Sequence, residues 1–216
     1  MDKKIINTLL NKLSKLFDND SSAEDAINVL KQKVLELPEN KKMPSSNSMD
    51  DVPIEISGKD GSYAVFSDSA CRGNPGPGSW GVVAQDYKGE LLFESSGFSM
   101  NTTNNKMELK GAIQGLIELD NFLSTEKDGV YSEIYLYSDS QYVVKGAQQW
   151  IEGWKKRGWK KADKKAPENL ELWQELDGQI QKMDNITFLW VKGHDGHPQN
   201  ERCDEIANQA LDDLGY

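Results

Sequence analysis

Residues 63–98 read YAVFSDSACRGNPGPGSWGVVAQDYKGELLFESSGF. The apolar pattern has the spacing of β-strands over residues 63–69, 80–87 and 90–98. Lys88-Gly89 is a good tight-turn pair between the second and third of these segments, so those two strands should pair antiparallel. This stretch therefore predicts three consecutive strands that begin a sheet.

After this stretch the pattern changes to alternating helices and strands. Amphipathic spacing predicts four helices, over residues 103–120, 140–150, 167–182 and 198–213. Short apolar runs predict two more strands, over residues 131–138 and 186–191. This order predicts an α/β fold: a mixed five-stranded sheet flanked by helices, with helices that cross over to the later strands.

The first 61 residues differ from the rest of the chain in their pattern of apolar and polar residues. Apolar residues at helical spacing predict a two-helix hairpin within residues 1–40. Residues 41–61 are polar and rich in turn formers, as linkers are, so the main domain is expected over residues 62–216. A hairpin of this length cannot bury both apolar stripes alone. It is expected to pack on the main domain, on a second copy or on another protein, and these three alternatives stay open.

The composition limits the classes of function. The chain has 216 residues, a net charge of −10 and a sequence pI of about 4.8. No apolar run is long enough for a membrane span, and the N-terminus lacks the features of a secretory signal. The two cysteines, Cys71 and Cys203, fit a reducing compartment, so we expect a cytoplasmic protein. The acidic pI alone argues against nucleic-acid binding.

One segment reverses that charge balance. Residues 150–165 carry seven basic residues against two acidic ones, together with three of the six tryptophans. Basic side chains can neutralise phosphates, and aromatic faces can pack on sugars or bases. A solvated loop with Trp150 in the core is the alternative. The candidate substrate-binding residues are Trp150, Trp154, Lys155, Lys156, Arg157, Trp159 and Lys160.

Four acidic residues lie where catalysis could use them. Asp68 and Asp139 follow apolar strand segments, and their carboxylates would meet at one sheet edge if those strands are parallel neighbours. Glu108 and Asp204 flank the apolar faces of predicted helices. Clustered carboxylates need cations, and oxygen ligands suit Mg²⁺ or Mn²⁺. Because any one Asp at a strand end more often forms a turn or caps a helix than binds a metal ion, these positions alone do not establish a metal site.

Four strings occur in order along the main domain: residues 66–78 (FSDSACRGNPGPG), 101–109 (NTTNNKMEL), 137–142 (YSDSQY) and 190–204 (WVKGHDGHPQNERCD). Together they resemble the signatures of the type 1 ribonuclease H family, over about residues 62–213. The resemblance implies an enzyme that cuts the RNA strand of RNA–DNA hybrids. By motif position, it implies that Asp68, Glu108, Asp139 and Asp204 bind metal ions. It also implies that His194 assists proton transfer or product release.

The resemblance extends to the substrate. It implies that the amide side chains of Asn74, Asn104 and Gln141 contact the hybrid near the cut, although turn formation or helix capping also explains the asparagines. The basic segment of residues 150–165 resembles the protrusion that grips the DNA strand in this family. Two positions depart from the pattern: Ser69, where many members carry Gly, and Asp195, where a small residue is common.

These observations lead to one expectation with two rivals. We expect a Mg²⁺-dependent endoribonuclease, with Mn²⁺ as the alternative ion, that uses two ions and leaves 5′-phosphate and 3′-hydroxyl ends. We expect the catalytic domain to be monomeric, with the N-terminal helices free to self-associate or to contact a protein. The rivals are a nuclease that tolerates double-stranded RNA and a hybrid-binding module without activity.

Overall fold

The computed structural model describes residues 10, 26, 27, 29, 30, 51–126, 129–193 and 195–216. The chain divides into two compact units, Met1–Asn47 and Ser48–Tyr216. In the first unit, Leu10 and Ile27 are buried together in a small apolar cluster. Almost all of the hairpin expected over residues 1–40 lies outside the described residues. The second unit holds the sheet and the candidate site.

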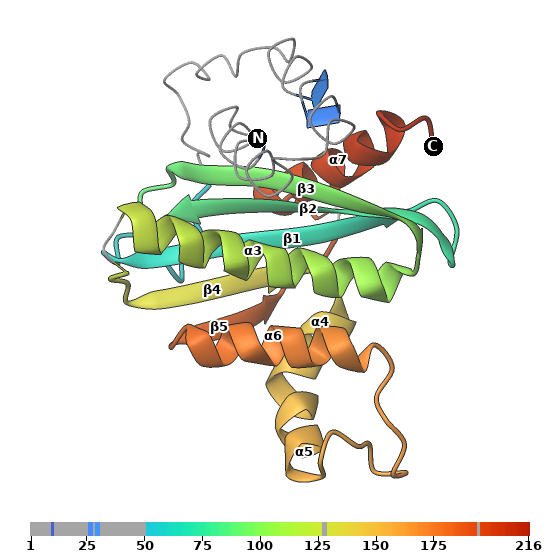
Figure 1. Ribbon diagram of the computed structural model, residues 1–216. Helices are drawn as coiled ribbons and strands as arrows, with labels where there is room; N and C mark the ends of the chain where they lie inside the picture. Colours follow the sequence, from blue (N-terminus) through green and yellow to red (C-terminus); the bar gives the residue numbers. More distant parts are fainter. Residues whose placement is uncertain (1–9, 11–25, 28, 31–50, 127–128, 194) are drawn as a thin grey trace. The chain divides into compact units, whose positions relative to one another are not determined.

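A mixed five-stranded sheet forms the centre of the second unit (Figure 1). Its strands are β1 (Ser62–Cys71), β2 (Gly76–Asp86), β3 (Leu91–Thr102), β4 (Glu133–Ser138) and β5 (Ile186–Trp190). They lie in the order β3-β2-β1-β4-β5. The pairs β1–β2 and β2–β3 are antiparallel, whereas β4 runs parallel to both β1 and β5. The predicted mixed sheet with antiparallel first strands is confirmed.

Helices cover both faces of this sheet (Figure 1). They are α3 (Asn104–Glu126), α4 (Gln141–Lys145), α5 (Ile151–Lys156), α6 (Leu170–Lys182) and α7 (Pro198–Asp212). Successive side chains of β1 point to opposite faces. Val65 packs in the core beneath α3 and α6, and Phe66 packs on the other side with Cys203 of α7. None of the described helices is long and apolar enough to cross a membrane.

The helix after β4 is longer than we expected. The prediction ended at residue 150, but α4 continues through a π-helical turn, Gly146–Trp150, into α5. The first part of the basic segment is therefore helical. Gly146 allows this path, because a Cβ there would lie 1.9 Å from the ring of Trp173. Trp173 comes from α6, distant in sequence, so local periodicity could not show the extension.

Residues 51–61 pack on the sheet rather than forming the end of the expected linker. Ile56 is fully buried in the cluster that contains Phe66 and Val83. The Tyr137 hydroxyl donates to Glu55 Oε2 at 2.9 Å. The physical reason for the difference is that a single apolar side chain, Ile56, anchors an otherwise polar, turn-rich segment. The composition of a whole segment does not reveal a contact made by one residue.

Candidate active site

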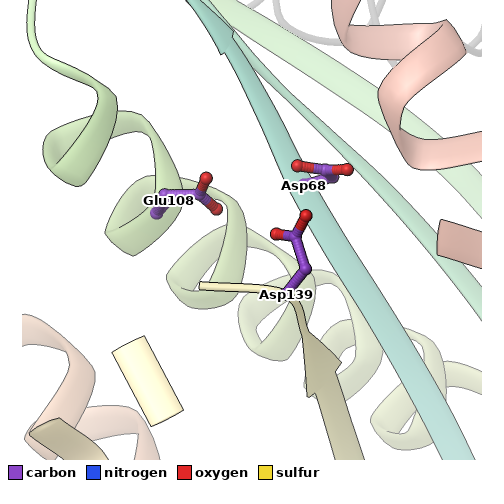
Figure 2. Close-up of side chains that lie close together, drawn as sticks. All are labelled: Asp68, Glu108 and Asp139. Carbon is purple, nitrogen blue, oxygen red and sulfur yellow. The ribbon is translucent and has the colours of Figure 1, made fainter. Parts of the chain in front are cut away.

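The parallel pairing of β1 and β4 places two carboxylates side by side. Ser67 of β1 pairs with Ser138 of β4. Asp68 follows Ser67 and Asp139 follows Ser138, so the two carboxylates lie next to each other (Figure 2). The strand β4 ends at Ser138, whereas β1 continues to Cys71 because its other edge stays paired with β2. The two strands are therefore parallel neighbours, as the carboxylate arrangement required.

The helix α3 brings a third carboxylate to the same place. Gly111 and Gly115 let the helix approach β1 closely: a Cβ on Gly111 would lie 3.4 Å from Ser67 Cβ, and one on Gly115 would lie 2.6 Å from Val65 Cγ1. Glu108 lies one turn before Gly111 on the same helix face. Its side chain is buried, with an exposed fraction of 4%.

Asp68, Glu108 and Asp139 form a carboxylate group (Figure 2). Each offers one oxygen, and these oxygens lie within 4.8 Å of one another. Glu108 Oε2 is buried and has no hydrogen-bond partner among the described residues. A buried carboxylate oxygen without a partner is costly, and a divalent cation would satisfy it. These all-oxygen ligands fit Mg²⁺ or Mn²⁺.

Burial and mutual repulsion change the acidity of this group. Burial, followed by the charge of Asp139, raises the pKa of Asp68 to about 7, against hydrogen bonds that favour the charged form. Burial, followed by the charges of Asp68 and Asp139, raises the pKa of Glu108 to about 8. Without a cation the group therefore holds protons near neutral pH, and a bound cation would displace them.

Asp204 lies on α7, half-buried and outside this group of three. Its Oδ1 accepts a hydrogen bond from Asn208 Nδ2 at 2.8 Å. The charge of Asp204 contributes to the raised pKa of Asp68, so the two carboxylates are electrostatically coupled. The structure thus gathers three of the four predicted acids and leaves the fourth beside them.

His194 lies outside the described residues, so its role stays a prediction. The preceding residue, Gly193, is described and lies directly against the carboxylate group. A Cβ at this position would lie 2.5 Å from Asp139 Oδ2. Glycine is therefore needed at position 193 for the loop to pass Asp139 without displacing it.

The three predicted amide side chains lie in different surroundings. Asn104, at the start of α3, donates to Glu108 Oε1 at 3.3 Å and accepts from Ser69 Oγ at 3.3 Å. Asn74 is exposed in the turn between β1 and β2. Gln141 is exposed at the start of α4, and its Oε1 accepts from Lys145 Nζ at 2.8 Å. Asn104 is thus the amide that the structure ties directly to the carboxylates.

The basic segment divides into buried and exposed side chains. Trp154 is 8% exposed, and its ring packs against those of Trp150 and Trp173, so a direct base contact does not follow for it. Lys155 Nζ lies 2.9 Å from Asp177 Oδ1, which engages its charge inside the fold. The exposed candidates are Lys156, Arg157 and Lys160, with Trp159 half-buried. The tryptophans thus help to fix the segment that presents these exposed charges.

Sequence reasoning did not single out Asn200. This side chain is 2% exposed, and its Nδ2 donates to Asp68 Oδ2 at 3.2 Å. It lies one helical turn before Asp204 on α7, inside the fourth string. An amide at that spacing from a candidate carboxylate is the signal that could have identified it.

Known proteins resemble this chain over the second unit. The family model described as RNase H matches residues 60–212. Ribonuclease HI of Pseudomonas putida is 48% identical over 153 residues, which cover 71% of this chain and 95% of that protein. Ribonuclease H of Dechloromonas aromatica is 45% identical over 150 residues, which cover 69% of this chain and 93% of that protein.

Solved structures named RNase H1 also match this chain. LC11-RNase H1, solved in complex with an RNA/DNA hybrid, matches with a TM-score of 0.56 and 28% identity over 71% of this chain and 99% of its own. RNase H1 from the halophilic archaeon Halobacterium salinarum matches with a TM-score of 0.54 and 28% identity over 71% of this chain and 99% of its own. Because the matched residues include the whole sheet and the carboxylate group, the chain belongs to the ribonuclease H family, as an enzyme of the bacterial ribonuclease HI type.

Proposed function

We propose that this enzyme hydrolyses the RNA strand of RNA–DNA hybrids with two Mg²⁺ ions, leaving 5′-phosphate and 3′-hydroxyl ends. The observation that carries the proposal is the group formed by Asp68, Glu108 and Asp139, with its unpartnered buried oxygen. The hybrid complex of LC11-RNase H1 supports the choice of substrate. Mn²⁺ is the alternative ion, because it accepts the same oxygen ligands.

Each carboxylate and its supports have a role in this proposal. Asp68, Glu108, Asp139 and Asp204 would hold the ions, which when bound activate water and stabilise the attacking and leaving oxygens. Asn200 keeps Asp68 oriented, and Asn104 does the same for Glu108. From its place in the sequence motif, His194 is proposed to move a proton near neutral pH.

Substrate selection is proposed to come from two surfaces. The amides of Asn74, Asn104 and Gln141 can both donate and accept, which suits the 2′-hydroxyls that distinguish RNA from DNA. The exposed Lys156, Arg157 and Lys160 would neutralise phosphates of the DNA strand. Trp159, half-buried beside them, would pack on a sugar.

The test is cleavage of an end-labelled hybrid by the full chain with Mg²⁺. Asp68→Asn and Glu108→Gln should each lose at least about 100-fold in kcat, since ligand loss should exceed the effect of losing a partner of a ligand. Glu126→Gln, an exposed change at the end of the same α3 helix, is the matched control and should retain wild-type cleavage.

Three results would contradict the proposal. Equal cleavage of double-stranded RNA would favour the tolerant nuclease. Product ends that carry a 3′-phosphate would mean that the bond from phosphorus to the 5′-oxygen was broken, whereas the proposal requires the 3′-oxygen to leave. An inactive wild type that binds the hybrid as well as Asp68→Asn does would favour a binding module without activity.

We further propose that the enzyme acts in the cytoplasm and that its catalytic domain is monomeric. Cys71 and Cys203 are free thiols, which agrees with a reducing compartment. The N-terminal hairpin over residues 1–40 is proposed to mediate self-association or a protein contact. Light scattering of the full chain, and of a chain without its first 50 residues, measures both oligomeric states.

A further inference from the structure

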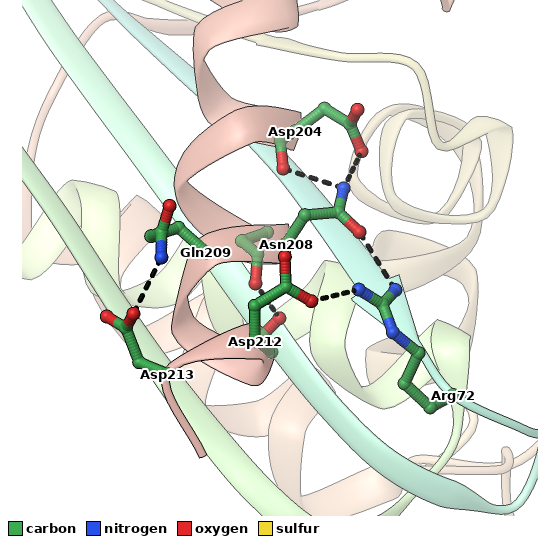
Figure 3. Close-up of polar contacts among 8 residues, drawn as sticks. Arg72, Asp204, Asn208, Gln209, Asp212 and Asp213 are labelled. Carbon is green, nitrogen blue, oxygen red and sulfur yellow. Dashed lines mark hydrogen bonds and ion pairs between the residues drawn. The ribbon is translucent and has the colours of Figure 1, made fainter. Parts of the chain in front are cut away.

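We propose that Arg72 and Asn208 position the fourth carboxylate, Asp204, for metal binding; this inference rests on the proposed function. The residues come from separate elements (Figure 3). Arg72 lies in the turn that follows β1, and Asn208 lies on α7 one helical turn after Asp204. Neither residue belongs to the carboxylate group, and both would act through Asp204.

A continuous chain of hydrogen bonds joins the three side chains (Figure 3). Arg72 Nη1 donates to Asn208 Oδ1 at 2.8 Å. Asn208 Nδ2 then donates to Asp204 Oδ1 at 2.8 Å and to the Asp204 backbone oxygen at 2.9 Å. The amide thus holds both the side chain and the backbone of Asp204.

The donor and acceptor chemistry gives this chain a direction. A guanidinium only donates hydrogen bonds, and an ionised carboxylate only accepts them. The amide between them has one accepting and one donating end, so Arg72 must face its oxygen and Asp204 its nitrogen. The two oxygens of Asp204 already favour the amide nitrogen. Arg72 reinforces this orientation by donating to the amide oxygen, and so limits how far Asn208, and with it Asp204, can turn.

The second contact of the Arg72 guanidinium, with Asp212, adds little to the stability of the fold. Arg72 Nη2 pairs with Asp212 Oδ1 at 3.0 Å, but both side chains are substantially exposed. Exposed ion pairs contribute little to folding stability. The Arg72 backbone N–H also donates to the Pro77 oxygen at 2.8 Å, which fixes the turn. Removing the guanidinium should therefore leave the fold intact while it releases Asp204.

The variants separate the two contacts of the Arg72 guanidinium, with Asn208 and with Asp212. Arg72→Met removes both contacts. Asn208→Asp keeps an acceptor for Arg72 but removes the donor to Asp204, and Asn208→Ala removes the amide. Asp212→Asn weakens only the ion pair and is the matched control. Arg72→Met and Asn208→Asp should each lower kcat on the hybrid about 10-fold, with KM changed less than twofold. Asp212→Asn should stay within twofold of the wild type.

A second readout needs no substrate. Mn²⁺ binding to the free protein, followed by electron paramagnetic resonance, should weaken about 10-fold in Arg72→Met and Asn208→Ala but not in Asp212→Asn. In an Asp204→Asn background, Arg72→Met should have no further effect, because the carboxylate it positions is gone. Thermal unfolding of each variant checks that the fold is retained.

Three outcomes would overturn the inference. Unchanged Mn²⁺ affinity with a raised, salt-sensitive KM in Arg72→Met alone would make Arg72 a phosphate contact. An equal loss in Asp212→Asn would make the ion pair a structural tie. A full further loss from Arg72→Met in the Asp204→Asn background would show that Arg72 acts elsewhere. If the wild type fails to cleave the hybrid, the proposed function fails, while the Mn²⁺ titrations still decide the positioning role.

Discussion

At the scale of single residues, the carboxylate group should make the stability of the metal-free protein depend on pH. The folded pKa of Asp68 is about 7 and that of Glu108 about 8, both above the values of about 4 expected after unfolding. The folded state therefore holds protons that the unfolded state has released. This contribution is complete below about pH 4 and is lost as pH rises through 7 and 8.

Urea unfolding in EDTA at pH 5 and pH 8 measures this effect. Glu108→Gln, which cannot ionise, should be more stable relative to the wild type at pH 8 than at pH 5, by about 3–4 kcal/mol. Mg²⁺ should reduce that difference, because it replaces the protons. If the wild type instead gains stability relative to Glu108→Gln from pH 5 to pH 8, burial and repulsion do not disfavour the ionised form of Glu108.

Gly193 gives a second prediction at this scale. Gly193→Ala should lower kcat and Mn²⁺ affinity by about 10-fold or more, because the new Cβ would displace Asp139 Oδ2, which lies 2.5 Å from its position. Gly178→Ala on α6, where a Cβ meets nothing within 4 Å, is the matched control and should keep full activity. Unaltered kinetics in Gly193→Ala would show that the loop can move away from Asp139.

At the scale of elements, Ile56 tests whether residues 51–61 belong to the fold. Ile56→Ala should lower the free energy of unfolding by about 2–5 kcal/mol, because this side chain is fully buried against Phe66. Ile54→Ala, two residues earlier and 84% exposed, is the control and should change it by about 0.5 kcal/mol at most. Equal effects of the two changes would mean that the segment does not pack on the sheet.

The elements also show which features a sequence can predict. Each strand of the second unit, and each of its helices except α5, was predictable, because its apolar period is local. The ends were harder: β2 begins at Gly76 rather than Trp80, because Gly78 still pairs with Cys71 in a crowded place where a Cβ would lie 2.6 Å from the Cys71 sulfur. A Gly-Pro-Gly run predicts a loop from local propensity, and only the pairing with β1 makes it a strand.

The candidate site follows the same division. Asp68 and Asp139 could be predicted because their positions depend on strand ends and one parallel pairing. The link from Arg72 to Asn208 could not, because it joins residues 136 positions apart through a polar contact that leaves no periodic trace. The burial of Trp154 could not be predicted for a related reason, since one of the rings that pack on it belongs to α6.

At the scale of the whole molecule, charge is distributed unevenly. The net charge is −10, and residues 150–165 contribute +5 of it, so the remaining 200 residues carry −15. Lys155 is engaged by Asp177, which leaves Lys156, Arg157 and Lys160 as the exposed charges nearest the helix. An acidic body should discourage loose binding elsewhere, so hybrid affinity should depend on salt through this one segment.

The salt dependence of hybrid binding measures that concentration of charge. In an Asp68→Asn background, which permits binding without turnover, Lys156→Gln and Lys160→Gln should each reduce the slope of log Kd against log salt by about 1. Lys88→Gln, an exposed change in the turn after β2, should leave the slope unchanged. Lys155→Gln should lower the unfolding midpoint, because its charge pairs with the nearly buried Asp177. It should change the salt slope of hybrid binding little. Equal slopes in all four variants would show that phosphate neutralisation is spread over the surface rather than concentrated in residues 150–165.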